Sequence, residues 1–127
     1  MSAIRSKDTS PELLLRKELH RRGLRYRLHK KGLPGRPDIV FPSKRVAVFV
    51  HGCFWHNHPG CRWWKMPVTN REFWKDKFAR NIARDHKNKA DLLELDWKAI
   101  TIWECEINRS PAAAADIVQD ALRERTL

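Results

Sequence analysis

Residues 46–61, which read VAVFVHGCFWHNHPGC, carry the side chains of this sequence that are best suited to chemistry. An apolar run ends at His51, and residues 51–61 hold three of the six histidines and two of the three cysteines. Thiolates and imidazoles bind transition metals, and imidazole also transfers protons near neutral pH. The crowding therefore predicts a metal site and a proton-transfer site where a buried strand gives way to a loop.

Four residues form a candidate zinc site. The spacing Cys53-x4-His58-x2-Cys61, followed much later by Cys105, gives a Cys3His set, which suits tetrahedral zinc. Because the protein would fill all four positions, the ion would be structural and would hold the loop on the sheet. One alternative uses His56 in place of His58. In another, the cysteines are small buried apolar residues and His58 is a surface side chain.

A second candidate site is hydrolytic and uses residues that are not among the proposed zinc ligands. Mg²⁺ prefers oxygen ligands and keeps several waters, so Asp38, a backbone carbonyl and substrate phosphates could hold it. His51 or His56 could take a proton from water, and Asp85 could fix the tautomer of that histidine. The alternative is that Asp38 is a turn residue and that the histidines and Asp85 are solvated.

Charge indicates the kind of partner. The chain has 127 residues and a formal net charge of +11, with a pI near 10.1 and six tryptophans. This balance favours a polyanion such as nucleic acid, with planar side chains available for base stacking, over an inert basic surface. No signal peptide or long apolar span is evident, so we expect a soluble, cytoplasmic protein with no membrane contact and reduced cysteines.

Periodicity and capping signals predict the elements that must position these residues. Ser10 and Ser110, each followed by proline, begin helices, and Thr69 or Asn70 can cap a third. Leu13, Leu14, Leu15 and Leu19 are expected to form the apolar stripe of the first helix. The predicted elements are helices at 10–23, 70–95 and 111–125, and strands at 24–29, 38–41, 45–50 and 98–103.

The order of these elements predicts an α/β fold: a single three-layer domain over 1–127, with a mixed central β-sheet flanked by helices. A hairpin of strands 38–41 and 45–50 should place Asp38 near His51. The crossover through the long helix should make strand 98–103 parallel to strand 45–50, which brings Cys105 towards the cysteine loop. On the long helix, Phe73, Phe78, Ile82, Leu92 and Leu93 should face inwards.

Four motifs resemble the Vsr, or very-short-patch repair, endonucleases, which nick one DNA strand beside a T:G mismatch. They are GRPDIVF, FVHGCFWHNH, EFWKDKFARNIARD and WEC, and the similarity covers residues 4–106. The resemblance implies the type II restriction endonuclease-like fold of the PD-(D/E)XK superfamily. Pro37-Asp38 of that pattern is present, whereas Phe49-Val50-His51 occupies the strand of the usual later acid and lysine.

The resemblance also implies roles for individual residues. Asp38 and the backbone carbonyl of Val50 match the magnesium ligands, and Cys53, His58, Cys61 and Cys105 match the zinc ligands. His56, paired with Asp85, matches the catalytic base, while His51, Glu12 and Asn81 match residues around the metal and phosphate. Phe54, Trp55 and Trp74 match aromatics that wedge into DNA, and we assign Arg36 and Lys65 to DNA contact. Pro59-Gly60 lengthens the zinc loop relative to familiar members.

We therefore expect a magnesium-dependent endonuclease with a structural zinc that acts as a monomer on mismatched double-stranded DNA. It would lie in the bacterial cytoplasm at the nucleoid, with mismatch-repair proteins as candidate partners. One alternative is a Vsr-like nuclease that acts on other DNA in restriction or phage defence. The other is a non-catalytic, zinc-stapled DNA-binding module.

Overall fold

The structure is a computed structural model that describes residues 10–28, 30–53 and 68–125. Within these residues, four strands form one mixed sheet in the order β1-β2-β3-β4. The strands are β1 (Arg27–Leu28), β2 (Ile39–Phe41), β3 (Val46–His51) and β4 (Lys98–Trp103). The helices are α1 (Ser10–Arg21), α2 (Arg71–Glu94), α3 (Glu104–Arg109) and α4 (Pro111–Glu124).

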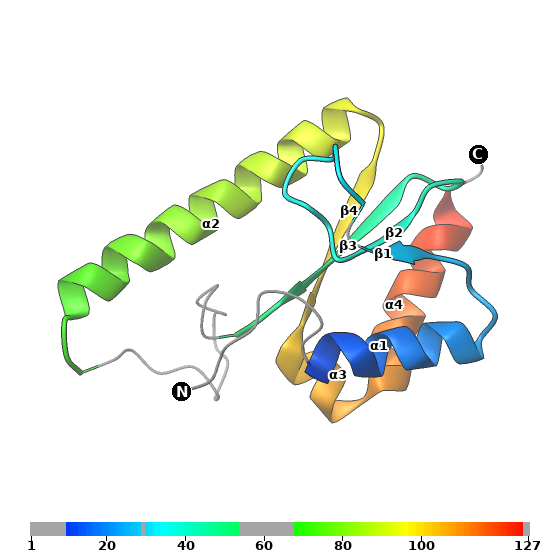
Figure 1. The fold of residues 1–127 in the computed structure, drawn as a ribbon, viewed down its shortest axis with the longest axis horizontal. Helices are drawn as coiled ribbons and strands as arrows, with labels where there is room; N and C mark the ends of the chain where they lie inside the picture. The colour runs from blue at the N-terminus through cyan, green and yellow to red at the C-terminus, as the bar shows by residue number, and fades with distance from the viewer. Residues whose placement is uncertain (1–9, 29, 54–67, 126–127) are drawn as a thin grey trace.

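The sheet has helices on both faces (Figure 1). α2 covers one face, and its first turns run well beyond the sheet, while α1, α3 and α4 pack on the other. β1–β2 and β2–β3 are antiparallel, and β3 and β4 are parallel, with His51 opposite Trp103. The predicted α/β fold with a mixed sheet between helices is confirmed, including the parallel crossover through α2.

Alternation along β3 divides the core into two parts, because successive side chains point to opposite faces. Val46 and Val48 pack with Leu15, Leu19 and the apolar residues of α3 and α4. Ala47 and Phe49 pack with Val40 of β2 and Leu92 of α2. This second, smaller part of the core leaves room beside α2 at the end of β3, where His51 lies.

Local signals explain most of the element ends. Ser110 accepts a hydrogen bond from the Ala113 N–H through its Oγ at 3.1 Å, so its predicted cap is confirmed. Gly23 has a φ of +77°, and the N–H of Leu24 reaches the Leu19 carbonyl at 3.1 Å, which closes α1. Asn70 precedes α2 in a left-handed conformation and caps nothing with its side chain, contrary to expectation.

Several expectations about burial and length were wrong. β1 covers two residues rather than the predicted 24–29. Leu13 and Leu14 are about two-fifths exposed, because Glu12 and Pro11 share the inner face of α1 with Leu15 and Leu19. Phe73 and Leu93 are also exposed, and only Phe78 and Leu92 of α2 are buried. α3 was not predicted at all.

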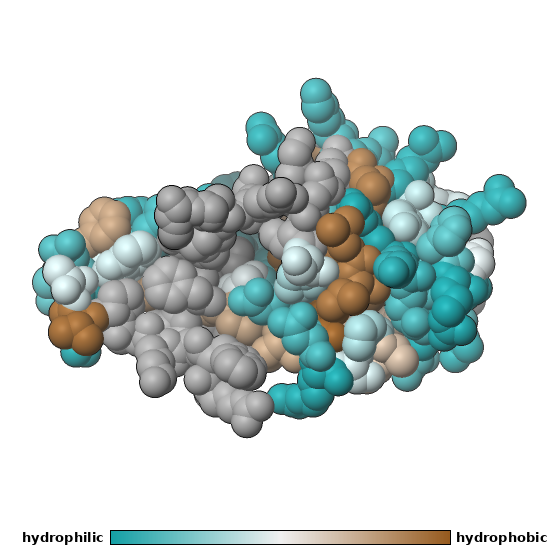
Figure 2. All heavy atoms as spheres, turned by 60° about the horizontal axis from the view of Figure 1, so that its bottom comes forward, coloured by the Kyte–Doolittle hydropathy of each residue, from teal (hydrophilic) through white to brown (hydrophobic). Residues whose placement is uncertain are grey.

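Figure 2 shows a mostly hydrophilic surface with apolar groups exposed near the middle of the view and at the end where α2 begins. The exposed apolar residues of that region are Val68 and Phe73. Among the described residues, no helix combines the length and the apolar character needed to cross a membrane.

Candidate active site

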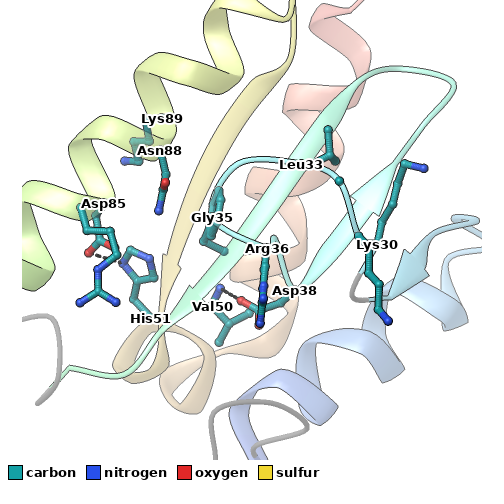
Figure 3. A pocket seen from close by; sticks show the side chains of 14 residues that line it. Lys30, Leu33, Gly35, Arg36, Asp38, Val50, His51, Asp85, Asn88 and Lys89 are labelled. Atoms are coloured by element: carbon teal, nitrogen blue, oxygen red, sulfur yellow. Dashed lines mark hydrogen bonds and ion pairs between the residues drawn. The ribbon is translucent and has the colours of Figure 1, made fainter.

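A cavity of about 840 Å³ lies between the sheet and α2. The loop at 30–36 lines it on one side, the end of β3 forms its floor, and α2 lines the other side (Figure 3). Arg84, Asp85, Asn88 and Lys89 face it from α2, because residues three or four apart share one side of a helix. Residues from three separate parts of the chain therefore meet in one cavity.

Asp38 lies at the floor of this cavity, one residue before β2. Its Oδ2 accepts a hydrogen bond from the backbone N–H of Val50 at 2.7 Å. A bond this short is typical of a charged acceptor and fixes the carboxylate beside the end of β3. The N–H and C=O of one strand residue point to the same side, so the Val50 carbonyl is expected on the Asp38 side of β3.

His51 is the last residue of β3 and is only 7% exposed. Its ring packs against Trp103 in an edge-on contact with a centroid distance of 5.3 Å, and against Phe49 at 6.0 Å. Its Nδ1 lies 3.9 Å from Oδ2 of Asp85, and in Figure 3 the two side chains point towards each other. This distance is too long for a direct hydrogen bond but allows attraction when His51 is protonated.

Cations outnumber acids around the cavity. Asp38 and Asp85 are the two carboxylates that line it, whereas the cationic side chains are Lys30, Lys31, Arg36, Arg84 and Lys89. An excess of positive charge around two carboxylates suits a bound polyanion together with a cation that the carboxylates hold. The sequence analysis assigned Arg36 of this group to DNA contact.

The loop at 30–36 comes close to α2 at Gly35. Gly35 has a φ of +78°, and a Cβ placed on it would meet the Nδ2, Cβ and Cγ of Asn88 at 2.8 to 2.9 Å. Because real Cβ atoms do not come this close, Gly35 is required both for its backbone conformation and for the contact. This contact was not predicted, although the Gly- and Pro-rich sequence KKGLPGRP indicated an irregular loop.

Gly35→Ala is expected to slow DNA nicking by roughly ten- to a hundredfold, because displacing the loop moves Arg36 and Asp38 relative to His51. The measurement is single-turnover nicking with thermal unfolding in parallel. Gly32→Ala is the matched control: its φ is +92°, but a Cβ there meets nothing within 4 Å. Equal rates for the two variants would show that backbone strain alone matters. Adding Asn88→Gly, which removes the whole side chain that a Cβ on residue 35 would meet, should restore part of the loss only in Gly35→Ala.

The other predicted site residues that the structure describes do not line the cavity. Glu12 is buried in α1, on the opposite face of the sheet, and pairs with Arg16 at 3.1 Å. Asn81 accepts a hydrogen bond from Arg84, one turn before Asp85. Trp74 stacks on Phe78 with a centroid distance of 5.8 Å, near the start of α2. Of the predicted site residues, Phe54, Trp55, His56, His58, Cys61 and Lys65 lie outside the described residues.

Two of the proposed zinc ligands are described, and both are buried. Cys53 and Cys105 each follow the last pair of the β3–β4 ladder by two residues, and Cys105 lies in the first turn of α3, so both leave the same end of the sheet. The backbone N–H of Cys53 donates to Glu104 Oε1 at 2.9 Å, which ties the two segments together. In the part of the chain that the structure describes, no three His, Cys, Asp or Glu side chains form a metal-binding group.

Magnesium does not require such a group. It binds through one or two carboxylates together with substrate oxygens and waters. Asp38, held by Val50 at the floor of the cavity, provides a carboxylate of this kind. A single fixed carboxylate, completed by substrate oxygens and waters, is a donor set that a magnesium ion could use.

Comparison with known proteins gives consistent matches over most of the chain. The family model of the DNA mismatch endonuclease Vsr matches residues 1–62. A type II nicking enzyme of Xanthomonas oryzae pv. oryzae is 48% identical over 85% of this chain and 79% of that protein. A type II nicking enzyme of Neisseria meningitidis is 44% identical over 84% and 76%, respectively. The DNA mismatch endonuclease Vsr of Escherichia coli is 39% identical over 98% and 77%.

The structure has a mixed sheet between helices and a cation-rich cavity that holds a carboxylate and a histidine, which are features of a nuclease. Together with these relatives, they define the class of the protein: a DNA endonuclease that nicks its substrate. The fold is consistent with the restriction endonuclease-like architecture. The chain belongs to the Vsr family of DNA mismatch endonucleases. Membership of a nuclease family of this kind implies a divalent metal cation.

Proposed function

We propose that this enzyme uses magnesium to nick one strand of duplex DNA next to a T:G mismatch, and that a structural zinc holds its central loop. The observation that carries the proposal is the position of Asp38. Its carboxylate is fixed by Val50 in a cavity that also holds His51 and Asp85. Asp38 and the carbonyl of Val50 would hold the metal ion. Relatives named as a mismatch endonuclease and as nicking enzymes support the reaction type.

In this mechanism magnesium supplies charge neutralisation at the scissile phosphate. A histidine accepts the proton of the attacking water, and Asp85 orients that histidine and stabilises its charged form. We assign the base to His56 and an assisting role near the phosphate to His51. Asp85 lies 3.9 Å from His51, which supports a role for this acid beside a histidine in the cavity, and its pairing with His56 is part of the proposal. Arg36 contacts the DNA backbone on the loop side.

Aromatic residues would provide the preference for a mismatch. Phe54, Trp55 and Trp74 would insert between bases, which costs a few kcal/mol per step and least at a weakened pair. Trp74 lies on the part of α2 that extends beyond the sheet, which supports access to a duplex. One active site is enough for a nick, so we propose that a monomer acts, over residues 1–127 as a single domain.

A second candidate is a nicking enzyme that acts on DNA without a mismatch as part of restriction or defence. The names of the two most similar relatives given above, type II nicking enzymes, favour it. The conserved chemistry would be the same, and only the recognised DNA would differ. The cavity beside Asp38 does not distinguish these two functions.

A comparison of three duplexes separates them. With magnesium present, a duplex with one T:G pair should be nicked at least about tenfold faster than the matched duplex, which corresponds to about 1.4 kcal/mol of discrimination. A branched duplex serves as the third substrate. Equal rates on the matched and T:G duplexes would favour the restriction function, and preferential cutting of the branched duplex would contradict both.

A further inference from the structure

The end of the sheet carries a row of groups that runs across the strands. The β1–β2 register pairs Leu28 with Ile39, so Lys30, two residues further on, lies beyond β1 at the same end as Asp38. Asp38 is in turn beside Val50 and His51 at the end of β3. His51 approaches Asp85 on α2. The order across the molecule is therefore lysine, aspartate, histidine, aspartate.

Cationic side chains lie on both sides of Asp38, His51 and Asp85. Arg84, next to Asp85, lies on the α2 side, where its Nη2 donates to Asn81. Arg36, Lys30 and Lys31 lie on the loop side, and in Figure 3 Arg36 extends beside Asp38 while Lys30 is on the outer limb of the loop. All of these cations are exposed, so they remain accessible to a ligand.

The span of this row matches a short length of nucleic acid. Neighbouring strands are about 4.8 Å apart, so β1 and β3 are roughly 10 Å apart. Successive phosphates of one strand rise about 3.4 Å along the duplex axis and lie farther apart along the strand itself, so a strand laid across this row places two or three phosphates over it at most. A strand laid over Asp38 would therefore carry the phosphates next to the one at Asp38 towards Lys30 and Lys31.

We propose that the cleaved DNA strand lies across the end of the sheet, and that Lys30, Lys31 and Arg36 bind the two or three phosphates on one side of the nick. Three cations on the loop side and two on the α2 side, Arg84 and Lys89, make this grip asymmetric. The Gly35–Asn88 contact fixes the loop so that these cations are held at a constant distance from Asp38. The proposal relies on cleavage at Asp38 but not on the identity of the mismatch.

The first test measures DNA binding without added magnesium, so that nothing is cut. Lys30→Ala/Lys31→Ala should reduce the slope of log Kd against log salt by about 1.8, or 0.9 per lost phosphate contact. Lys17→Ala/Arg123→Ala is the matched control, since it removes the same charge from exposed positions on α1 and α4, over the opposite face. Equal slopes for the two double variants would overturn the proposal, whether or not the enzyme prefers mismatches.

The second test locates the contacts along the DNA. Single phosphates around the nick are replaced one at a time by neutral methylphosphonates, and nicking by the parent and by Lys30→Ala/Lys31→Ala is compared. Two or three neutral positions on one side of the nick should weaken the parent but have little further effect on the variant. If the parent and the variant lose the same amount of activity at every neutral position, or if positions on both sides of the nick have equal effects, these lysines act only through the net positive potential of the protein.

Discussion

Replacing Asp38 by asparagine is expected to lower the rate of nicking by about a thousandfold or more. A bound metal ion contributes several kcal/mol to the stabilisation of transition-state charge, and each 1.36 kcal/mol is a factor of ten in rate. Asparagine keeps an oxygen that can accept from the Val50 N–H, which now donates to Asp38 at 2.7 Å. The fold should therefore survive, and a loss of rate would report on the charge alone.

The experiment is a single-turnover assay over a range of magnesium concentrations. Asp96→Asn is the matched control, because Asp96 is an exposed aspartate that pairs with Arg45 far from the cavity. Binding of DNA without magnesium should be unchanged or tighter in Asp38→Asn, since a negative charge near the phosphates is lost. A variant that cuts as fast as the parent would remove Asp38 from the mechanism.

Loss of a zinc ligand is expected to have the second large effect. Purified protein should contain about one zinc per chain, and Cys105→Ala should lose it and unfold roughly 10 °C lower. Cys53→Ala is expected to behave in the same way, although the backbone N–H of Cys53 can still donate to Glu104. If the cysteines are only small buried apolar residues, both alanine variants should cost about 1–2 kcal/mol and the parent should contain no zinc.

Histidine variants distinguish the two possible fourth ligands. His58→Ala should release zinc, whereas His56→Ala should keep zinc and lose nicking activity. His86→Ala serves as the control, since His86 is exposed on α2 and has no role in either site. Zinc loss from His56→Ala, with zinc retained in His58→Ala, would reverse the assignment of structural and catalytic histidines.

The pattern of side chains in the sequence predicted the strands, through their apolar residues, and the helix ends, through their capping residues. An uninterrupted apolar run identified β3 as a central strand, and the length of α2 between β3 and β4 required a parallel crossover. Ser110 and Gly23 marked helix ends correctly because each acts on its immediate neighbours. The Ser110 hydroxyl caps the helix that follows, and Gly23 can adopt the positive φ that ends the helix before it. The proximity of Asp38 to the end of β3 followed from the same hairpin geometry.

Features that depend on tertiary contacts could not be obtained in this way. Leu13 and Leu14 look equivalent to Leu15 in the sequence, but only the packing of α1 against α3 and α4 determines which of them is buried. α3 is six residues long, and the Glu106 side chain that accepts from the Trp103 N–H at 2.9 Å supports its start. Such a short helix has no periodicity to detect.

Three residues of the candidate site were predicted from the sequence, but the residues that surround them were not. Asp38, His51 and Asp85 were identified as chemical groups, and the structure brings all three to one cavity. The contact between Gly35 and Asn88 joins residues with no shared sequence signal, so neither was a candidate. Lys30 and Lys31 could not be singled out among 26 basic residues, since charge alone does not say which lysines and arginines meet a substrate.

The parallel pairing of β3 with β4 also has a consequence for how the chain folds during synthesis. Val46 pairs with Lys98, so β3 leaves the ribosome well before its partner and must wait for α2 and β4. Until then VAVFV is an uncharged edge of high β-propensity, the kind of segment that joins strands of other molecules. Chains that stop before β4 should therefore aggregate, and the cavity around Asp38 cannot be complete in any of them.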